Sequence, residues 1–193
     1  MAQPIERFEA GVTVGYSNLS LDDSAGNLDG KGGLHFEPRL TWRGFERIPQ
    51  LGIGIAVGIS FYRDESPNPD AMPMFGLEPE EAFEEMELVV PEFQFSWRQP
   101  INETWIVEGG VGVGWAYADY SAGDLFDGNF VISSFGDEDS SVSVHPFARA
   151  GHAGERWAIG VEAGYLWTDI DFGPPVGGGL SEWRVGLFLT YSN

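Results

Sequence analysis

The stretch from Thr104 to Tyr120 reads TWIVEGGVGVGWAYADY, and its alternate positions differ in character. The row counted from Trp105 is apolar with an aromatic at each end, whereas the other row is mostly Gly and Ala and contains one carboxylate, Glu108. Strict alternation predicts a β-strand with two unlike faces. The ten steps from Trp105 to Trp115 would cover roughly 25 Å in a tilted strand, which is the height of the apolar band on a membrane barrel.

The same alternation recurs along the chain, and we predict a strand wherever it does. The predicted strands span residues 7–19, 34–43, 51–61, 86–97, 104–120, 140–150, 157–167 and 183–192. The connections between them alternate between long and short. This order predicts an all-β fold, an eight-stranded antiparallel up-and-down transmembrane β-barrel, with both chain ends on the side of the short turns.

Three prolines, Pro38, Pro91 and Pro146, fall in the middle of predicted strands. Proline has no backbone N–H, so each removes one donor from the hydrogen-bond ladder. We predict a β-bulge at each of them. The alternative is a weakened seam through which an apolar ligand leaves the barrel sideways.

Alternation alone fits both a soluble barrel with an apolar interior and a membrane barrel with an apolar exterior. Three features favour the membrane barrel. The polar rows are largely Gly, Ala and Ser, whereas a soluble exterior would be rich in Lys and Glu. The apolar rows of several strands end in aromatics at two levels. The Gly-x-Trp signature of soluble lipocalins is absent near the start of the first strand.

Length and charge narrow the function classes. With 193 residues the chain is predicted to be one domain over residues 1–193, and we expect a monomer. The net charge of −20 argues against nucleic-acid binding. The acidic residues gather in the long connections, where the basic residues are Lys31 and Arg63.

In pattern the whole chain resembles the small eight-stranded outer-membrane barrels of the OmpX, OmpW and OmpA-transmembrane-domain kind. The resemblance implies a Gram-negative outer membrane, with periplasmic termini, extracellular long loops and membrane lipid as the surrounding partner. Such barrels usually finish on a terminal aromatic, most often Phe, whereas the last aromatic here is Tyr191. The predicted membrane-interface aromatics are Phe8, Tyr16, Trp42, Trp97, Trp105, Trp115, Trp157, Trp167, Trp183 and Tyr191.

The predicted inward rows carry charged side chains of both signs. An eight-stranded barrel is just wide enough for side chains to fill it, and buried charges need partners. We therefore predict a lumen charge network that plugs the barrel, without catalytic residues, cofactor or metal. Its predicted members are Glu9, His35, Glu37, Arg39, Glu92, Glu108, His145, Arg149, Glu162 and Arg184.

The long connections add two expectations. Clustered carboxylates such as Glu84 and Glu85 could hold divalent cations. Three aromatics, Phe126, Phe130 and Phe135, suggest that two strands continue beyond the membrane as a hairpin.

The function predicted from the sequence is a structural or interaction role. The alternative is a conduit for small apolar solutes. Third comes a lipid A-modifying enzyme, because some small outer-membrane barrels are lipid A deacylases and Ser143 with His145 loosely resembles their Ser/His pair. A soluble ligand-binding barrel is the outside possibility.

Overall fold

The computed structural model describes residues 7–22, 28, 30–45, 47–66, 79–126, 130–172 and 178–193. None of these residues belongs to a helix long and apolar enough to cross a membrane. The described part of the chain folds into β1 (Arg7–Asp22), β2 (Gly32–Arg43), β3 (Leu51–Ser66), β4 (Pro79–Pro100), β5 (Trp105–Phe126), β6 (Phe130–Ala153), β7 (Trp157–Asp171) and β8 (Gly178–Ser192).

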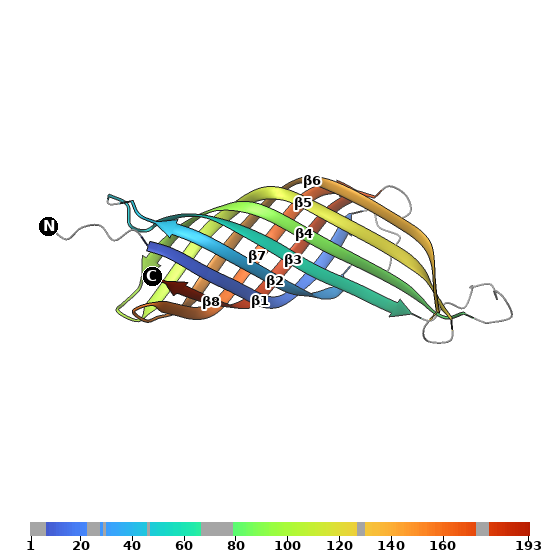
Figure 1. Cartoon of the computed structure of the whole chain (residues 1–193), viewed down its shortest axis with the longest axis horizontal. Helices are drawn as coiled ribbons and strands as arrows, with labels where there is room; N and C mark the ends of the chain where they lie inside the picture. Colours follow the sequence, from blue (N-terminus) through green and yellow to red (C-terminus); the bar gives the residue numbers. More distant parts are fainter. Residues whose placement is uncertain are drawn as a thin grey trace.

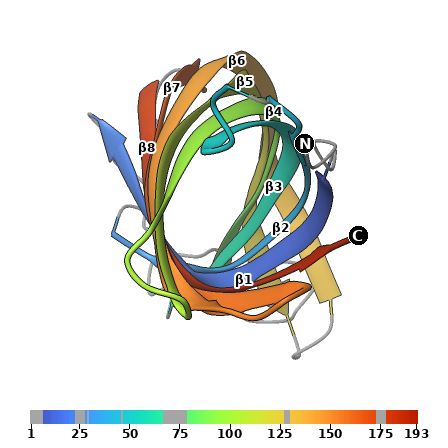
Figure 2. The ribbon, with the colours of Figure 1, turned by 90° about the vertical axis from the view of Figure 1, so that its left-hand side faces the viewer.

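The eight strands form one closed barrel in sequence order, and every neighbouring pair is antiparallel. Closure is made between β1 and β8, where Val14 lies opposite Leu187. The ribbon forms a ring when viewed from one end (Figure 2), and β1 begins at the same end at which β8 finishes (Figure 1). The predicted fold class is therefore confirmed.

The prediction of bulges at the three strand prolines is wrong. Pro38, Pro91 and Pro146 lie in register opposite Val12, Val57 and Val111. The shifts in register lie instead near the strand ends that adjoin the long connections, for example between Leu21 and Asp22. Each proline side chain points outward, and its missing N–H interrupts only the ladder on one side, so the strand needs no extra residue.

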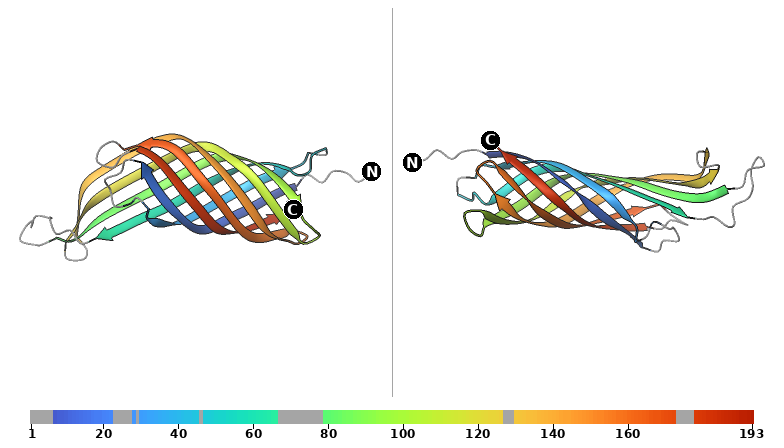
Figure 3. Two further views of the ribbon diagram at one scale, coloured as in Figure 1. Left: turned by 180° about the vertical axis from the view of Figure 1, so that it is seen from behind. Right: turned by 90° about the horizontal axis from the view of Figure 1, so that it is seen from below.

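Three strands are much longer than the sequence pattern predicts. Strands β4, β5 and β6 continue past the barrel rim, and β5 and β6 remain paired as far as Phe126 opposite Phe130. Figure 3 shows this extension, together with the end of β3, reaching beyond the other strands. The predicted hairpin is confirmed. Its bounds were missed because a strand with water on both sides does not need alternating apolar residues.

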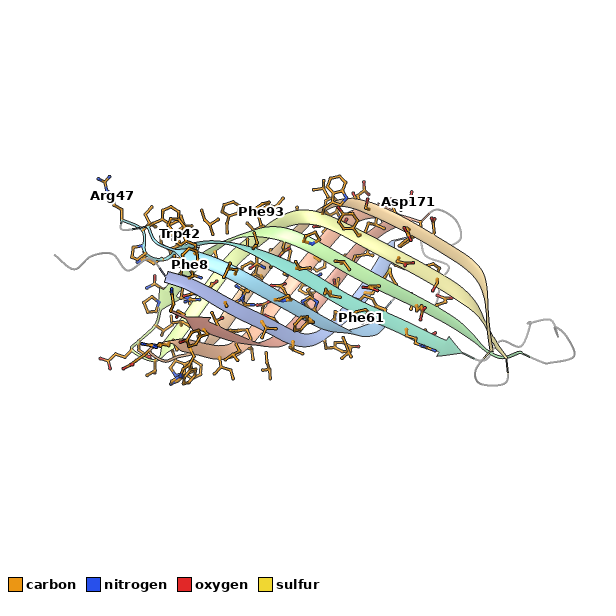
Figure 4. All side chains as sticks on the ribbon, viewed as in Figure 1. Phe8, Trp42, Arg47, Phe61, Phe93 and Asp171 are labelled. Carbon is orange, nitrogen blue, oxygen red and sulfur yellow. The ribbon has the colours of Figure 1, made fainter. Side chains whose placement is uncertain are left out.

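The apolar rows face outward. Ile55 and Leu187 are 54% and 64% exposed, and Val111 is partly exposed, whereas their neighbours Ala56 and Phe188 are buried. In Figure 4, Phe8, Phe61 and Phe93 project from the outer surface of the strands. This sidedness is opposite to that of a soluble ligand-carrying barrel, whose apolar row faces the interior.

The interior is divided into two parts. The part next to the short turns is filled by charged and polar side chains. The part next to the long connections is an apolar core that includes Leu88, Leu166 and Leu180, all fully buried. The prediction of a polar lumen does not extend to this part, because the inward rows turn apolar near the loop ends of β1, β4, β7 and β8.

Candidate functional site

The charged interior begins beside the short turns with two carboxylates and two guanidinium groups. Arg98 donates from Nη1 and Nη2 to both carboxylate oxygens of Glu9, at 2.7 and 2.9 Å. Its Nε also donates to Glu108, at 2.8 Å. Arg43 bridges the same two carboxylates at 3.0 and 2.7 Å. Charge-assisted pairs of this kind satisfy several donors at once and fix the side chains in place.

A second group lies deeper in the barrel, around Glu162. Arg149 Nε donates to the Glu162 carboxylate, and Arg39 Nη1 approaches the same carboxylate at 3.2 Å. Thr13 accepts a hydrogen bond from Arg39 and donates one to Glu162. The Arg149 guanidinium also lies 4.1 Å from the centre of the Phe147 ring, within the range of a cation–π contact.

The centre of the interior holds Glu37, Glu92, Gln94 and His145, which come from β2, β4 and β6. The Gln94 amide donates to Glu37 at 2.9 Å and to Glu92 at 2.6 Å. His145 Nδ1 lies 3.2 Å from Glu92 Oε1. All four side chains are buried, so their remaining polar atoms depend on one another.

A last polar group lies below the apolar core. Arg184 donates to Glu182 at 2.8 Å. The Ser60 hydroxyl donates to the other oxygen of Glu182 and is in hydrogen-bond contact with His35 Nδ1, at 2.5 and 3.0 Å. This is the charged group of the interior that lies next to the apolar core.

Glycines on the odd strands make room for these long side chains. A methyl group added at Gly58 would lie 2.9 Å from Arg184 Nη1, and one at Gly52 would lie 2.7 Å from Arg43 Nη1. At Gly112 and Gly164 it would collide with the Glu92 carboxylate and with His145 Nε2. The small inward rows of β3, β5 and β7 therefore accommodate side chains from the even strands.

The structure buries all ten of the predicted lumen residues. It adds three charged residues that the sequence prediction left out of the network: Arg43, Arg98 and Glu182. Arg98 and Glu182 lie just outside the predicted strand limits. Continuing the alternation by one step from Ser96, or back from Arg184, places both on the inward row.

The predicted interface aromatics lie on the outer surface, where nine of them are exposed and Trp42 is half-buried against Phe45. Some lie beside the short turns, where His152 stacks on Trp157 and meets Trp105 edge-on. Others, such as Trp115 and Trp167, lie ten residues further along their strands. Phe8 and Trp42 mark the turn end in Figure 4.

The outer face of the extension is acidic. Glu87, Asp119 and Glu138 are exposed and lie directly opposite one another on β4, β5 and β6. Grooves of about 360 and 430 Å³ border this row, and both are lined by Glu87 and Asp119. Of the carboxylates predicted to hold cations, Glu84 and Glu85 are described, whereas Glu78 and the side chains of Glu80 and Glu81 lie outside the described part.

The side chains considered for an enzyme are buried in the lumen. Ser143 and His145 are both fully buried, and the imidazole contacts Glu92, which could orient it. An enzyme that acts on membrane lipid needs its nucleophile at the lipid surface. Neither Ser143 nor His145 is therefore placed to act on a membrane lipid.

A closed antiparallel barrel with eight strands, an apolar exterior and a charged interior has the architecture of the small outer-membrane β-barrels. No protein-family model and no characterised relative matches the sequence. Among solved structures, the chain is similar to Ail, the attachment invasion locus protein of Yersinia pestis, in complex with the heparin analogue sucrose octasulfate. The TM-score is 0.54 and the identity 12%, over 96% of this chain and 99% of Ail.

The chain is also similar to Neisserial surface protein A, with a TM-score of 0.55 and 10% identity, over 94% of this chain and 95% of that protein. At these identities the likeness is one of fold. The suspected resemblance to small eight-stranded outer-membrane barrels is confirmed at that level.

Proposed function

We propose that this protein is an integral outer-membrane barrel with a closed interior that presents an acidic platform to cationic partners. In this proposal the turns and chain ends are periplasmic, and the extension is extracellular. The barrel is neither a pore nor an enzyme; it anchors and orients the platform.

The observation that carries the proposal is the row of Glu87, Asp119 and Glu138. Like charges directly opposite one another destabilise a sheet, so the row weakens the extension unless a cationic group neutralises it. The groove lined by Glu87, Asp119 and Glu138 could admit a basic side chain, whereas the other groove already has Arg63 in its lining. Divalent cations of the outer leaflet would compete for the same carboxylates.

The filled interior supports the absence of conduction. The charge network and the apolar core of Leu88, Leu166 and Leu180 follow one another along the bore. Moving an ion past them would require breaking buried ion pairs, which is costly. The same filling argues against passage of apolar solutes.

The likeness to Ail does not extend to its ligand. Sucrose octasulfate is a polyanion, and a chain with a net charge of −20 and an acidic extension would repel it. We therefore expect this protein to bind cationic ligands in preference to polyanions.

The test is binding of a fluorescent oligolysine peptide to the barrel refolded in detergent, with sucrose octasulfate as the anionic counterpart. The wild type should bind oligolysine with an affinity that falls as salt rises, because salt screens exposed charges. The double variant Glu87→Gln/Asp119→Asn should bind several-fold more weakly.

The matched control is Glu103→Gln/Glu155→Gln, which changes the net charge equally but at exposed positions of the short turns. It should leave binding near the wild-type level. Equal loss in both double variants would show that net charge alone attracts the peptide, and preferential binding of sucrose octasulfate would contradict the proposal.

A further inference from the structure

The charges of the lumen do not balance. The buried carboxylates are Glu9, Glu37, Glu92, Glu108, Glu162 and Glu182, and the guanidinium groups that face them are Arg39, Arg43, Arg98, Arg149 and Arg184. Six negative groups thus meet five positive ones, and one carboxylate lacks a counter-charge while the histidines are neutral. An uncompensated buried charge is expensive, so either a proton on an imidazole or a bound cation should supply the missing positive charge.

Glu92 is the carboxylate with the weakest compensation, because it has no guanidinium group within ion-pair distance among the described residues. Among the described residues, its one ion-pair partner is His145, with Nδ1 at 3.2 Å from Oε1. The other carboxylate oxygen, Oε2, is buried without a hydrogen-bond partner. The remaining five carboxylates each lie within 4.0 Å of at least one guanidinium group.

Atoms suited to a metal ion converge at this point. One ligand atom from each of Glu37, Glu92 and His145 lies within 4.8 Å of the other two. His145 Nδ1 is 4.0 Å from Glu37 Oε2, and this oxygen also lacks a hydrogen-bond partner. His35 Nε2 is likewise unpartnered and lies 3.8 Å from Glu37 Oε2. Tetrahedral zinc with bonds of about 2.0–2.2 Å places its ligands roughly 3.3 Å apart, so the three ligand atoms would have to move closer together to bind the ion.

The surrounding backbone keeps this space open. Gly112 faces the Glu92 carboxylate and Gly164 faces His145 Nε2, and a methyl group at either position would occupy the room. Each of the three residues also lies beside a strand proline: Glu37 and His145 precede Pro38 and Pro146, and Glu92 follows Pro91. Proline restricts the backbone of the residue before it to extended conformations, which applies to Glu37 and His145.

We propose that Glu37, Glu92 and His145 form a zinc-binding site in the centre of the barrel. Carboxylate oxygens and an imidazole nitrogen are ligands that zinc accepts. The ion would neutralise Glu92 and satisfy the free oxygens of Glu37 and Glu92. Arg184, whose Nη1 lies 3.8 Å from Glu37, would retain its 2.8 Å ion pair with Glu182. The site would tie β2, β4 and β6 together in the interior.

The test is metal retention by the whole chain. The protein is refolded in detergent with added zinc, washed with a chelator and passed through gel filtration, and its zinc content is measured by mass spectrometry. Heat-modifiable migration on a gel reports the folded barrel in each sample. The wild type should retain about one zinc ion per chain, as expected for a single buried site.

Refolding the wild type with cobalt gives an independent reading. Cobalt in a tetrahedral site absorbs strongly in the visible, whereas six-coordinate cobalt absorbs weakly. A folded wild type without retained zinc, or with only the weak cobalt spectrum, overturns the proposal whether or not any variant folds.

The variants locate the site. His145→Gln and Glu92→Gln should lose the retained zinc, and His152→Gln should keep it, because His152 lies on the outer surface between two tryptophans. Zinc that is lost in His152→Gln and kept in His145→Gln would place the ion elsewhere and contradict the assignment. Neither result depends on whether the extension binds oligolysine.

Discussion

The two halves of the barrel interior solve the same packing problem with different chemistry. On the turn side, Glu108 is in contact with Arg43, Arg98 and Arg149. On the loop side, Leu88, Leu166 and Leu180 fill the same bore with apolar side chains. A charged filling needs every partner present, whereas an apolar filling needs only the right volume. In the charged half, removing one side chain should therefore lower the stability strongly. In the apolar half, the loss of stability should depend on the volume removed.

The largest effect should come from Glu162→Ala. This carboxylate faces Arg149, Arg39 and Thr13, and its removal leaves buried guanidinium charge without a partner. The free energy of unfolding should fall by about 3–5 kcal/mol. Urea titration of the refolded barrel measures it. Glu103→Ala, at an exposed turn position, should change it by less than about 0.5 kcal/mol; similar losses in the two variants would mean that the network contributes little.

Next in size should be Leu88→Ala on the loop side. Leu88 is fully buried, and truncation leaves a cavity, so the expected loss of unfolding free energy is about 2–5 kcal/mol. Leu187→Ala is the matched control, because Leu187 faces outward and surrounding lipid or detergent can fill the vacated volume. If Leu187→Ala costs as much as Leu88→Ala, the sidedness of the rows is wrong.

A smaller effect should follow from overpacking the charged half with Gly112→Ala. The added methyl group would meet the Glu92 carboxylate, and forced shifts of this kind cost about 1–3 kcal/mol. Gly109→Ala, three positions earlier, meets nothing within 4 Å and should be close to neutral. Urea denaturation of both variants measures the difference. Equal losses of unfolding free energy would mean that β5 tolerates substitution poorly in general, rather than that Gly112 makes room for Glu92.

The smallest effect should be that of a partly exposed ion pair at the loop end of β3. Lys31 and Asp64 are 2.8 Å apart, and the Lys31 side chain is 42% exposed. A double-mutant cycle with Lys31→Ala and Asp64→Ala should give a coupling of about 0.2–1 kcal/mol that declines as salt is added. A coupling as large as that of a buried pair such as Arg149 and Glu162 would mean that burial does not strengthen the ion pairs of this protein.

Much of the barrel was predictable because a strand that separates lipid from a packed interior must alternate at every step. Residues such as Ile55 and Leu187 on one row, with Gly54 and Gly186 on the other, carry that signal without any tertiary information. The lengths of β4, β5 and β6 were not predictable in this way. Beyond the membrane both faces of a strand can be polar, and the alternation that marks a strand disappears.

The sequence by itself determined that there are eight strands, which rows face outward, and that charges of both signs enter the barrel. Only the tertiary structure decided which of those charges meet. Glu37, Glu92 and His145 lie on β2, β4 and β6, far apart in the chain, and their approach depends on the register of each pair of strands and on closure of the ring. Alternation specifies the face on which a side chain lies, but its height in the barrel is a property of all eight strands together.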